Sequence, residues 1–489
     1  MQVLPNRVLL INLPYYEDIF GRSTVKAAVS PSTIIMSLAT IASAVREAGL
    51  EVHILDLNIS KNASRSFSEK LIEFRPGYIG FTFTTAIFHI AKRYASMARD
   101  LLPHITVIGG GPHSTVLPEE VLRCGPFDMV LRGEGDFALC EIVTGSDLSS
   151  IPGVSFRIGE DIVHNPARPN IPNLDSLPLP ALDLYDVQRY RHPNFIARRN
   201  PVASMETSRG CYGACKFCSS RLTKFRVKSV DRVIAEMEFI LSLGFREIHL
   251  VDDMFTADIK RVKKICQAII DSRLDISWYP RGGIRVDHVD QEMFHMMKRA
   301  GVWSVAYGIE SGNQQILDNI EKRITLDQIR HAIRLAKNAG LSVDGYFMLG
   351  HPGETEATIK DTIKFSTSLG LDYAKYAINI PLPGTPQFDI WEKQGVIKTR
   401  DWTKYTFSTP PSEIYDHPTV DWRIIEKYYR QGPRKFYLRP SYVLRRVIKD
   451  ARSGRIFANT RTLLKSLPQW TNFHLPRRQK SLRAREGHV

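Results

Sequence analysis

The sequence predicts an α/β protein built from three parts. An N-terminal doubly wound parallel sheet comes first, a partial (β/α)6 barrel follows, and a basic, mostly helical region ends the chain. Short apolar runs alternate with helical spacing in two separate stretches, and a Pro-rich stretch without a period divides them. The expected boundaries are residues 1–145 for the sheet, 146–200 for the linker, 201–400 for the barrel and 401–489 for the C-terminal region.

The first part is expected to form a Rossmann-like sheet. A helix is predicted over residues 37–48, because the spacing is helical and Gly49 is a typical stop. In parallel sheets of this kind, ligands bind at the carboxyl ends of the strands. The turns after the third, fourth and fifth strands should therefore share one edge. The predicted strands are 7–13, 51–56, 78–83, 106–108 and 129–131, and the three turns are 82–85, 109–113 and 133–135.

The alternation of strand and helix resumes after residue 202 and gives six β/α units. Six units are too few to close an eight-stranded barrel, so an incomplete (β/α) barrel is predicted. Beyond about residue 400 the strand pattern fades. The predicted strands are 203–207, 247–251, 277–280, 304–308, 343–349 and 373–379, with the clearest helices at 230–243, 260–272, 291–300 and 326–339.

Three of the six cysteines crowd into one loop directly after the first barrel strand. Cys211, Cys215 and Cys218 have the spacing C-x3-C-x2-C, so their thiolates can bind one metal centre. A [4Fe–4S] cluster usually takes four cysteines, and three leave one iron open for another ligand. The alternatives are three chance cysteines and a zinc site that lacks a fourth ligand in this loop, for which His192 upstream and Cys266 downstream are candidates.

The net charge of +15 belongs almost entirely to the tail. Residues 421–489 hold 18 Lys and Arg against four Asp and Glu, which leaves +1 for the first 420 residues. Helical stretches at 422–430 and 442–451 mix apolar and basic side chains. Three interpretations stay open: a helical extension packed on the barrel, a surface for anionic lipid, and a nucleic-acid surface, which is the least favoured.

The N-terminal apolar run is short and lacks a cleavage site of small residues, which argues against a signal peptide. No stretch of about 18 uncharged apolar residues indicates a membrane span. The expected location is cytoplasmic. If the basic tail binds anionic lipid, we also expect peripheral contact with the inner face of the membrane.

The cysteine loop resembles that of the radical S-adenosylmethionine (SAM) superfamily. The aromatic Phe217 just before the third cysteine matches that family's pattern, and other family elements follow in order over residues 200–390. They are Val251-Asp252-Asp253 after the second strand, the G-I-E-S-G turn Gly308–Gly312, the segment Gly345–Glu354 (GYFMLGHPGE) and Pro381–Pro386 (PLPGTP).

This resemblance implies a [4Fe–4S] cluster on the three cysteines and a SAM site beside it. For Asp252 and Asp253, the alternative role is that of a helix N-cap pair. For Arg285, the alternative role is that of one partner in a surface salt bridge. For Gly350 and Gly353, the alternative is that they are present only because a turn requires positive φ, which glycine adopts without steric cost. The implied SAM-binding residues are Phe217, Asp252, Asp253, Arg285, Gly308, Glu310, Ser311, Gly312 and Gly350.

The N-terminal part resembles the cobalamin-binding domain of class B radical SAM methylases. Small residues let the backbone approach the nucleotide tail of cobalamin, and hydroxyls can bond its phosphate. The D-x-H-x-x-G histidine of many cobalamin proteins is absent from the first turn (PYYED), so the lower axial ligand of cobalt stays open. The implied residues are Thr82, Phe83, Thr84, Gly109, Gly110, Gly111, His113, Gly133, Glu134 and Gly135.

Two points on this domain stay open. For His113, a hydrogen-bonding or plain surface role is favoured over ligation of cobalt. The alternative for the whole domain is a vestigial flavodoxin-like fold that binds nothing. Methylthiotransferases, a competing family, need three further cysteines here, and only Cys124 and Cys140 are present.

The resemblance implies a cobalamin-dependent C-methyltransferase. It would act through a 5'-deoxyadenosyl radical on an unactivated carbon of a small-molecule or lipid-like substrate, because such a carbon has no acidic proton for a general base. An electron donor such as flavodoxin or ferredoxin is expected. The alternatives are a cobalamin-dependent radical SAM cyclase or rearrangement enzyme, a non-catalytic cobalamin- or metal-binding protein, and an RNA-modifying enzyme. Tyr212, Tyr279 and Tyr346 lie near predicted strand ends, and none is marked as catalytic.

Overall fold

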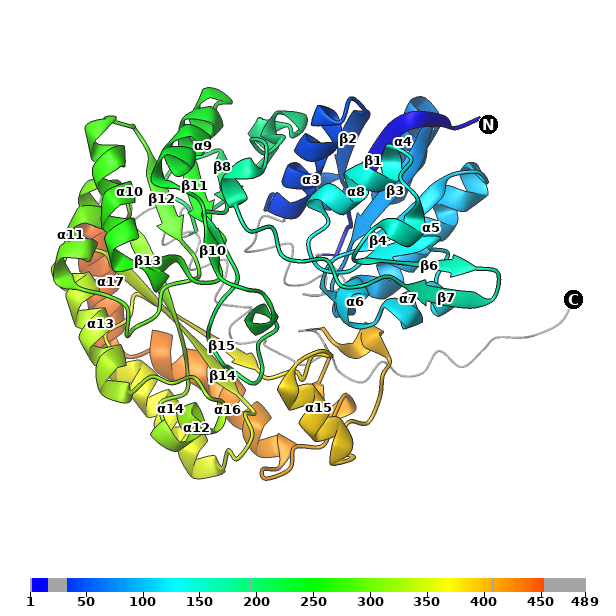
Figure 1. The fold of residues 1–489 in the computed structure, drawn as a ribbon. Helices are drawn as coiled ribbons and strands as arrows, with labels where there is room; N and C mark the ends of the chain where they lie inside the picture. Colours follow the sequence, from blue (N-terminus) through cyan, green and yellow to red (C-terminus); the bar gives the residue numbers. More distant parts are fainter. Residues whose placement is uncertain (1, 16–32, 194–195, 407–408, 453–489) are drawn as a thin grey trace, which may run out of the picture.

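The computed structural model describes residues 2–15, 33–193, 196–406 and 409–452. Two α/β units lie side by side, and a C-terminal segment containing α15 (Pro386–Lys393) runs across their junction (Figure 1). The predicted fold class is confirmed: a sheet of Rossmann type is followed by a partial barrel and then by helices. Among the described residues, the search for a helix long and apolar enough to cross a membrane finds none.

The N-terminal sheet contains the five predicted parallel strands and two more. Its strand order is β2-β1-β3-β4-β5-β6-β7, and the last two strands form an antiparallel hairpin on β5. The hairpin was not predicted, because its short strands carry no clear period. The strands are β1 (Leu4–Asn12), β2 (Glu51–Asp56), β3 (Pro76–Thr82), β4 (Thr106–Gly110), β5 (Met129–Leu131), β6 (Val154–Ile158) and β7 (Asp161–His164).

Helices cover both faces of this sheet, as the doubly wound prediction requires. Along β1, Val8 and Leu10 pack on one face while Leu9 and Ile11 pack on the other, because successive strand side chains alternate. The first face is covered by α3 (Met36–Glu47) and α8 (Asp136–Val143), and the second by α4 (Ala63–Phe74) and α5 (Phe88–Leu101). Two short helices, α6 (Pro112–Val116) and α7 (Pro118–Cys124), follow β4.

The barrel consists of two parallel three-stranded sheets. The orders are β12-β11-β8 and β13-β14-β15, and single bridges from Trp278 to Val302 and from Ile284 to Tyr307 connect them. A short antiparallel pair, β9 (Ser208–Arg209) and β10 (Arg226–Val227), flanks the cysteine loop. The six barrel strands are β8 (Val202–Met205), β11 (Glu247–Leu250), β12 (Ser277–Pro280), β13 (Ser304–Glu310), β14 (Ser342–Leu349) and β15 (Tyr373–Ile378).

Helices cover the outside of the barrel strands. On β14, Val343, Phe347 and Leu349 are buried beneath them, while Asp344 and Tyr346 point to the opposite, inner side. The four predicted helices are present within one residue at each end. The helices are α9 (Val230–Ser242), α10 (Ile259–Asp271), α11 (Gln291–Arg299), α12 (Gln314–Asn319), α13 (Leu326–Asn338) and α14 (Glu356–Ser368).

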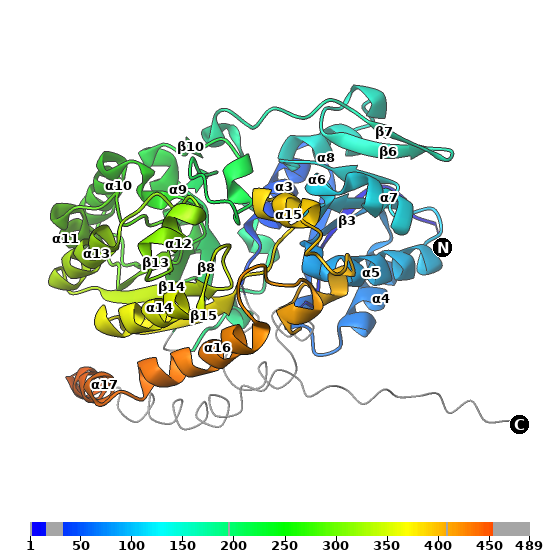
Figure 2. The same ribbon diagram turned by 90° about the horizontal axis from the view of Figure 1, so that it is seen from below.

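The C-terminal region packs on both units. Phe388, Trp391 and Trp402 belong to the same buried cluster as Phe83 and Phe88 of the N-terminal unit. The chain then returns to the barrel as α16 (Trp422–Tyr437), which lies against α14 and β15 (Figure 2), and continues into α17 (Pro440–Arg452). The expected helical extension packed on the barrel is therefore present.

Candidate functional site

The cysteine loop leaves the barrel after β8 and returns through β10. At the base of the loop, Gly210 has φ +85° and lies against the segment that leads into β10. A Cβ atom at this position would come within 2.4 Å of the Thr223 carbonyl oxygen and 2.5 Å of that of Lys224. The Cys211 N–H donates to the same Thr223 oxygen at 3.3 Å. Only glycine combines this backbone conformation with this close approach.

The three thiols lie in one loop and are free of disulfides. Cys215 is buried, while Cys211 and Cys218 are half-buried. Burial raises the pKa of the Cys211 and Cys215 thiols, and the Gly213 N–H, which donates to the Cys211 sulfur at 3.2 Å, opposes the rise at Cys211. An N–H aimed at sulfur stabilises the thiolate, which is the form that binds metal.

Backbone hydrogen bonds hold this loop on two sides. The Lys216 N–H donates to the Ile320 oxygen at 3.0 Å, next to the end of α12, and the Gln387 N–H of α15 donates to the Lys216 oxygen at 3.1 Å. The Phe217 ring lies 5.4 Å from the ring of His351. Three distant segments of the chain therefore position the loop.

The donor set fits an iron–sulfur cluster better than zinc. Within the described ranges, no three His, Cys, Asp or Glu side chains are grouped as ligands of a single metal ion, and this includes the side chains of Cys211, Cys215 and Cys218. Cys266 lies in the core on α10, where burial raises its pKa to about 12. The His192 ring packs 5.7 Å from that of His249. Neither candidate for a fourth zinc ligand joins the loop, whereas three cysteines suffice for a cluster with one open iron.

Charged side chains approach the cysteine loop from β13 and the segments around it. Glu310 is buried with φ +63°, and the Lys322 ammonium donates to its Oε1 atom at 2.9 Å. Burial lowers the pKa of Lys322, but Glu310 and Cys215 raise it more, so it stays above its ordinary value. Arg285 forms two hydrogen bonds of 2.9 Å with Asp287 and lies beside Gly213. The predicted salt bridge of Arg285 thus exists, and it lies at the loop.

The rest of the G-I-E-S-G turn packs into α14. A Cβ atom at Gly312 would come 2.4 Å from the Phe365 Cβ atom. The Gly312 N–H donates to the Thr362 hydroxyl at 3.0 Å, and the Ser311 and Thr362 hydroxyls are 3.1 Å apart. Ser311 and Gly312 are therefore engaged with the helix, and this packing holds Glu310 in place.

The two adjacent aspartates differ in environment. Asp252 is buried and accepts hydrogen bonds from the Thr207 N–H at 2.7 Å, the Thr207 hydroxyl at 2.5 Å and the Ser208 hydroxyl at 2.6 Å. Burial raises its pKa, which these donors oppose. The N-cap interpretation is wrong, because Asp258 caps α10. Asp253 is exposed and accepts from Ser220 at 2.7 Å.

A buried His–Glu pair lies in the segment after β14. Gly350 and Gly353 both have positive φ, as the alternative interpretation expected, and the Gly350 N–H donates to Glu354 at 2.5 Å. Burial raises the pKa of Glu354 to about 8 and lowers that of His351 to about 3. Neither ring nitrogen of His351 has a hydrogen-bond partner in the described part of the chain. We did not predict this pair, although its position between two glycines after a strand was a signal.

The inner side of the barrel carries polar side chains. The Tyr279 hydroxyl donates to Asp344 at 2.6 Å, and Tyr346 is in register with Lys375 on the next strand. Burial raises the pKa of Tyr279. Tyr212 lies elsewhere, with its hydroxyl 3.2 Å from His288. Of the three tyrosines noted from the sequence, two therefore share this inner surface.

The three predicted cobalamin turns meet at the carboxyl edge of the N-terminal sheet. The Phe83 N–H donates to the Gly110 oxygen at 3.1 Å, and the Gly133 N–H donates to the Thr115 hydroxyl at 3.0 Å. Gly111, at φ +94°, lies so close that a Cβ atom would be 2.8 Å from the Phe83 oxygen. Thr84 and Gly133 are exposed at this edge. The hydroxyls and open backbone fit the phosphate and amides of a nucleotide tail.

His113 lies inside this edge instead of on its surface. Its ring packs against Phe88 and Trp402, with centroids at 4.7 and 5.9 Å. Its Nδ1 atom lies 3.2 Å from the Thr85 hydroxyl, and burial lowers its pKa to about 4. The surface role is therefore wrong, and the hydrogen-bonding role is the one the structure shows.

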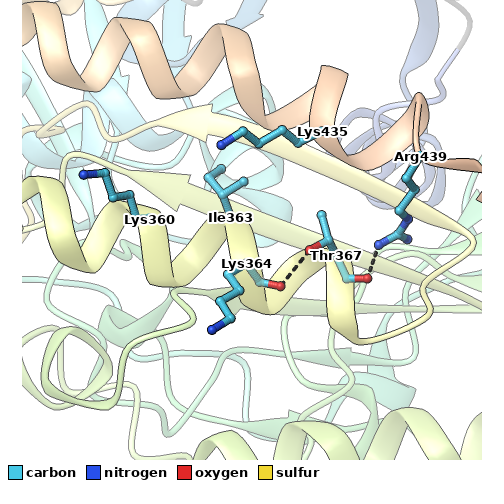
Figure 3. A pocket seen from close by; sticks show the side chains of 6 residues that line it. All are labelled: Lys360, Ile363, Lys364, Thr367, Lys435 and Arg439. Carbon is cyan, nitrogen blue, oxygen red and sulfur yellow. Dashed lines mark hydrogen bonds between the residues drawn. The ribbon is translucent and has the colours of Figure 1, made fainter.

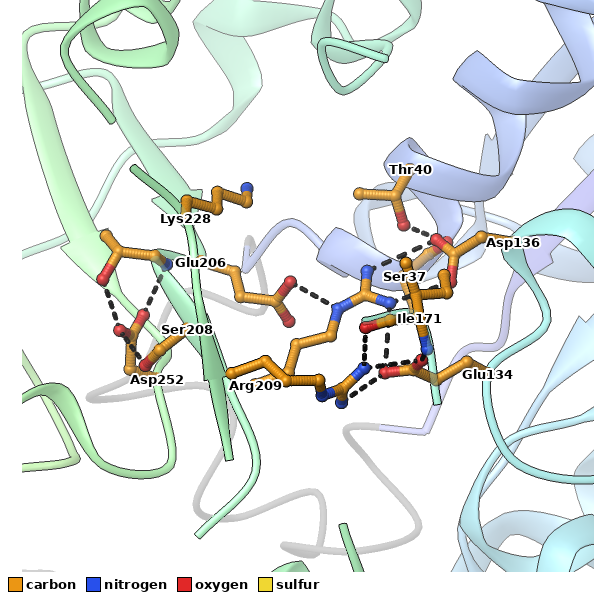
Figure 4. Close-up of polar contacts among 12 residues, drawn as sticks. Ser37, Thr40, Glu134, Asp136, Ile171, Glu206, Ser208, Arg209, Lys228 and Asp252 are labelled. Carbon is orange, nitrogen blue, oxygen red and sulfur yellow. Dashed lines mark hydrogen bonds and ion pairs between the residues drawn. The ribbon is translucent and has the colours of Figure 1, made fainter. Parts of the chain in front are cut away.

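Ion pairs connect this edge to the base of the cysteine loop (Figure 4). Arg226 on β10 donates to Glu134 at 2.7 and 2.9 Å, and Arg209 on β9 donates to Asp136 at 2.9 Å. Glu134 also accepts from the Ile171 N–H at 2.7 Å. The carboxylate of Glu134, a predicted cobalamin residue, is thus engaged with the barrel.

Comparisons with known proteins support both halves of the site. Residues 205–366 match the model of the radical SAM superfamily, and residues 23–143 match that of the B12 binding domain. An uncharacterized methyltransferase from Pyrococcus horikoshii is 35% identical over 437 residues, which cover 87% of this chain and 93% of that protein. The anaerobic magnesium-protoporphyrin IX monomethyl ester cyclase of Rubrivivax gelatinosus is 26% identical and covers 78% of this chain and 69% of its own length.

Solved structures agree with the fold. The radical SAM methyltransferase TsrM from Kitasatospora setae, with cobalamin and a [4Fe–4S] cluster bound, superposes with a TM-score of 0.65 at 20% identity and covers 81% of this chain and 75% of that one. The same enzyme is known with a tryptophan substrate and a SAM analogue bound. At this identity the likeness concerns the arrangement of the two units.

Proposed function

Because the chain belongs to the cobalamin-dependent radical SAM family, we propose that it is a C-methyltransferase acting on an unactivated carbon. It is a radical SAM enzyme, and the cofactors of its family are a [4Fe–4S] cluster, SAM and cobalamin. When bound, the cluster and SAM supply a 5'-deoxyadenosyl radical, and cobalamin carries the methyl group.

One observation carries the proposal: the two strands that flank the cysteine loop also bind the carboxyl edge of the N-terminal sheet. Arg209 and Arg226 precede and follow the three cysteines, and both pair with the turn after β5. A methyl carrier held at that edge would face the cysteine loop. This arrangement supports methyl transfer, because the methyl donor and the substrate radical must meet.

Each predicted residue then has an assigned part. Cys211, Cys215 and Cys218 would hold the cluster. The loop N–H groups and the cations Lys322 and Arg285 stabilise negative charge there. The proposed SAM residues are Phe217, Asp252, Asp253, Arg285, Gly308, Glu310, Ser311, Gly312 and Gly350, and those of cobalamin are Thr82, Phe83, Thr84, Gly109, Gly110, Gly111, His113, Gly133, Glu134 and Gly135.

The proposed substrate is a small molecule that enters the inner side of the barrel. The relative TsrM has such a substrate, tryptophan. In this chain, Tyr279, Asp344 and Tyr346 would contact it with hydroxyls and a carboxylate. These groups support a substrate with polar groups near the reacting carbon better than a purely hydrocarbon one.

A cyclase or rearrangement enzyme is the second candidate, because a cyclase is among the similar proteins. An experiment with labelled SAM separates the two. The protein is reconstituted anaerobically with iron, sulfide and hydroxocobalamin, and then given a strong reductant and SAM labelled in its methyl group. 5'-Deoxyadenosine and S-adenosylhomocysteine are quantified by mass spectrometry, and the labelled methyl group, which neither compound retains, is followed into cobalamin and product. A methyltransferase forms both products, whereas a cyclase forms deoxyadenosine alone.

Variants at two cysteines provide the control. Cys215→Ser should abolish both products and lower the bound iron, because Cys215 lies in the loop. Cys124→Ser, at an exposed cysteine on α7, should change neither. Full product formation by Cys215→Ser would contradict the assignment of the cluster. If wild-type protein with an intact cluster forms neither product, that result would contradict the assignment of the chain as a radical SAM enzyme.

We also propose peripheral contact with an anionic membrane through α17. One face of this helix carries four apolar side chains that are 43–63% exposed: Val443, Leu444, Val447 and Ile448. They share this face because residues at positions i, i+1, i+4 and i+5 lie on the same side of a helix. Arg445 and Arg446 lie between them in sequence. Such a mixture of apolar and basic side chains favours the surface of a membrane with anionic lipid.

An electron donor such as flavodoxin or ferredoxin stays a prediction.

A further inference from the structure

A basic cleft lies between α14 and α16 on the outer side of the barrel, away from the cysteine loop. Its volume is about 420 Å³. Side chains from α14 form one wall, and those from α16 and the residue after its C-cap form the other (Figure 3). The lining residues are Lys360, Ile363, Lys364, Thr367, Lys435 and Arg439.

The lining carries four cations and no carboxylate. Lys360 has an acidic partner, because its ammonium lies 3.2 Å from Glu356. Lys364 and Lys435 form no ion pair with any described residue. Like charges gathered in one cleft repel each other, and this repulsion raises the free energy of the cleft until an anion enters it.

Arg439 is held in a fixed orientation at one end of the cleft. Its guanidinium donates to the Thr367 carbonyl oxygen and lies 4.4 Å from the centroid of the Phe436 ring. Two of its donors, Nε and Nη2, are buried and have no acceptor among the described residues, so Arg439 acts on the cleft through its positive charge.

From these contacts we infer that the cleft binds a phosphate group, as a monoester or a diester. Arg439 adds a fixed positive charge at one end, and the exposed ammonium groups of Lys364 and Lys435 offer point charges and N–H donors from opposite walls, to which phosphate oxygens can bind. Ile363 forms an apolar floor beneath them. The phosphate belongs either to a soluble compound or to the headgroup of a lipid, since α17, with its exposed apolar face, follows the cleft directly.

The test measures binding of inorganic phosphate to the full-length protein by isothermal titration calorimetry, with potassium chloride keeping the ionic strength constant. The double variant Lys364→Gln/Lys435→Gln removes one cation from each wall. Its matched control, Lys260→Gln/Lys264→Gln, removes two exposed lysines on α10 and the same net charge. We expect the cleft variant to bind at least tenfold more weakly and the control to match wild type.

A second arm distinguishes the sources of the phosphate. Sedimentation with vesicles of phosphatidylcholine plus phosphatidylglycerol is measured for the same three proteins. If only the cleft variant fails to sediment with the vesicles, the phosphate belongs to a lipid headgroup. If the cleft variant binds phosphate more weakly but all three proteins sediment equally, the ligand is a soluble compound. Equal behaviour of the cleft variant and its control in both arms would overturn the inference, because any binding would then follow net charge alone. Circular dichroism checks that both variants fold.

Discussion

Gly210 decides whether the cysteine loop can form. It has φ +85°, and a Cβ atom there would come within 2.5 Å of the carbonyl oxygens of Thr223 and Lys224, in the segment that leads into β10. Gly244, after α9, also has positive φ, at +96°, but a side chain there would meet open space. The two positions therefore separate the cost of backbone strain from the cost of a clash.

We expect Gly210→Ala to destabilise the protein by more than about 2 kcal/mol and to lower the iron bound per chain, because strain and clash add. Gly244→Ala should cost only about 1 kcal/mol and leave the iron content unchanged. Urea unfolding and iron analysis of the reconstituted proteins measure both effects. Equal losses in the two variants would mean that the close approach at Gly210 is relieved without cost.

Glu354 is a buried acid whose pKa is raised to about 8 by burial. Its folded-state pKa lies above the unfolded value, so the folded state binds the proton more tightly. Stability is therefore lost as the pH rises from the unfolded pKa to the folded one. His351, with a pKa of about 3, changes charge in the folded state far below neutrality.

Between pH 6.5 and 8, the stability of wild type should fall relative to that of Glu354→Gln, by about 1 kcal/mol or more, since one pKa unit is about 1.4 kcal/mol. The difference between the two proteins cancels the titration of all other groups. Urea unfolding at several pH values gives the comparison. Parallel pH profiles would show that Glu354 is not protonated at neutral pH.

At the scale of elements, α17 presents an apolar face that no described residue covers fully. We expect Leu444→Ser/Val447→Ser to weaken sedimentation with vesicles containing phosphatidylglycerol about tenfold or more, because burial of each side chain contributes about 1–2 kcal/mol. Val163→Ser/Ile162→Ser, on the hairpin strand β7, provides a control at half-buried apolar positions. Equal weakening in both variants, or none in the first, would argue against membrane contact through α17.

The helix α14, which follows the G-I-E-S-G turn after α12, α13 and β14, shows how the packing of a distant helix positions a site. α14 supplies Thr362 and Phe365, which hold Ser311 and Gly312. The same helix forms a wall of the basic cleft through Lys360 and Lys364. One helix therefore serves the turn beside the cysteine loop on its inner side and the proposed phosphate site on its outer side.

At the scale of the whole molecule, the Arg226–Glu134 pair connects the two units. Both side chains are largely buried, with 6% and 12% of their area exposed. Removing one partner of such a pair leaves a charge without compensation, whereas removing both is less costly. The pair lies between the carboxyl edge of the sheet and the base of the cysteine loop.

In cobalamin-free protein, Arg226→Gln and Glu134→Gln should each destabilise by roughly 2–4 kcal/mol, and the double variant should lose less than the sum. Urea unfolding of the four proteins closes the cycle. An unchanged stability of Glu134→Gln without cobalamin would contradict the structural role and favour Glu134 as a cobalamin residue.

Much of the architecture was predictable from the chain. Periodicity located the five parallel strands of the first sheet, all six barrel strands and the main helices, because each element must bury one side at its own spacing. The hairpin of β6 and β7 escaped, since short strands at a sheet edge carry little periodic signal. The spacing of Cys211, Cys215 and Cys218 indicated a metal centre, because one local loop carries all three thiols.

The sequence by itself therefore determined what depends on neighbours along the chain: the elements, the cysteine loop and the turns at strand ends. Only the tertiary structure decided what depends on distant partners. It engaged Asp252 with Thr207 and Ser208 and Glu134 with β10, placed His113 against Trp402, and brought α14 and α16 together around four cations. The physical reason is that burial and charge pairing arise between segments far apart in the chain, and no local pattern records which of them will meet.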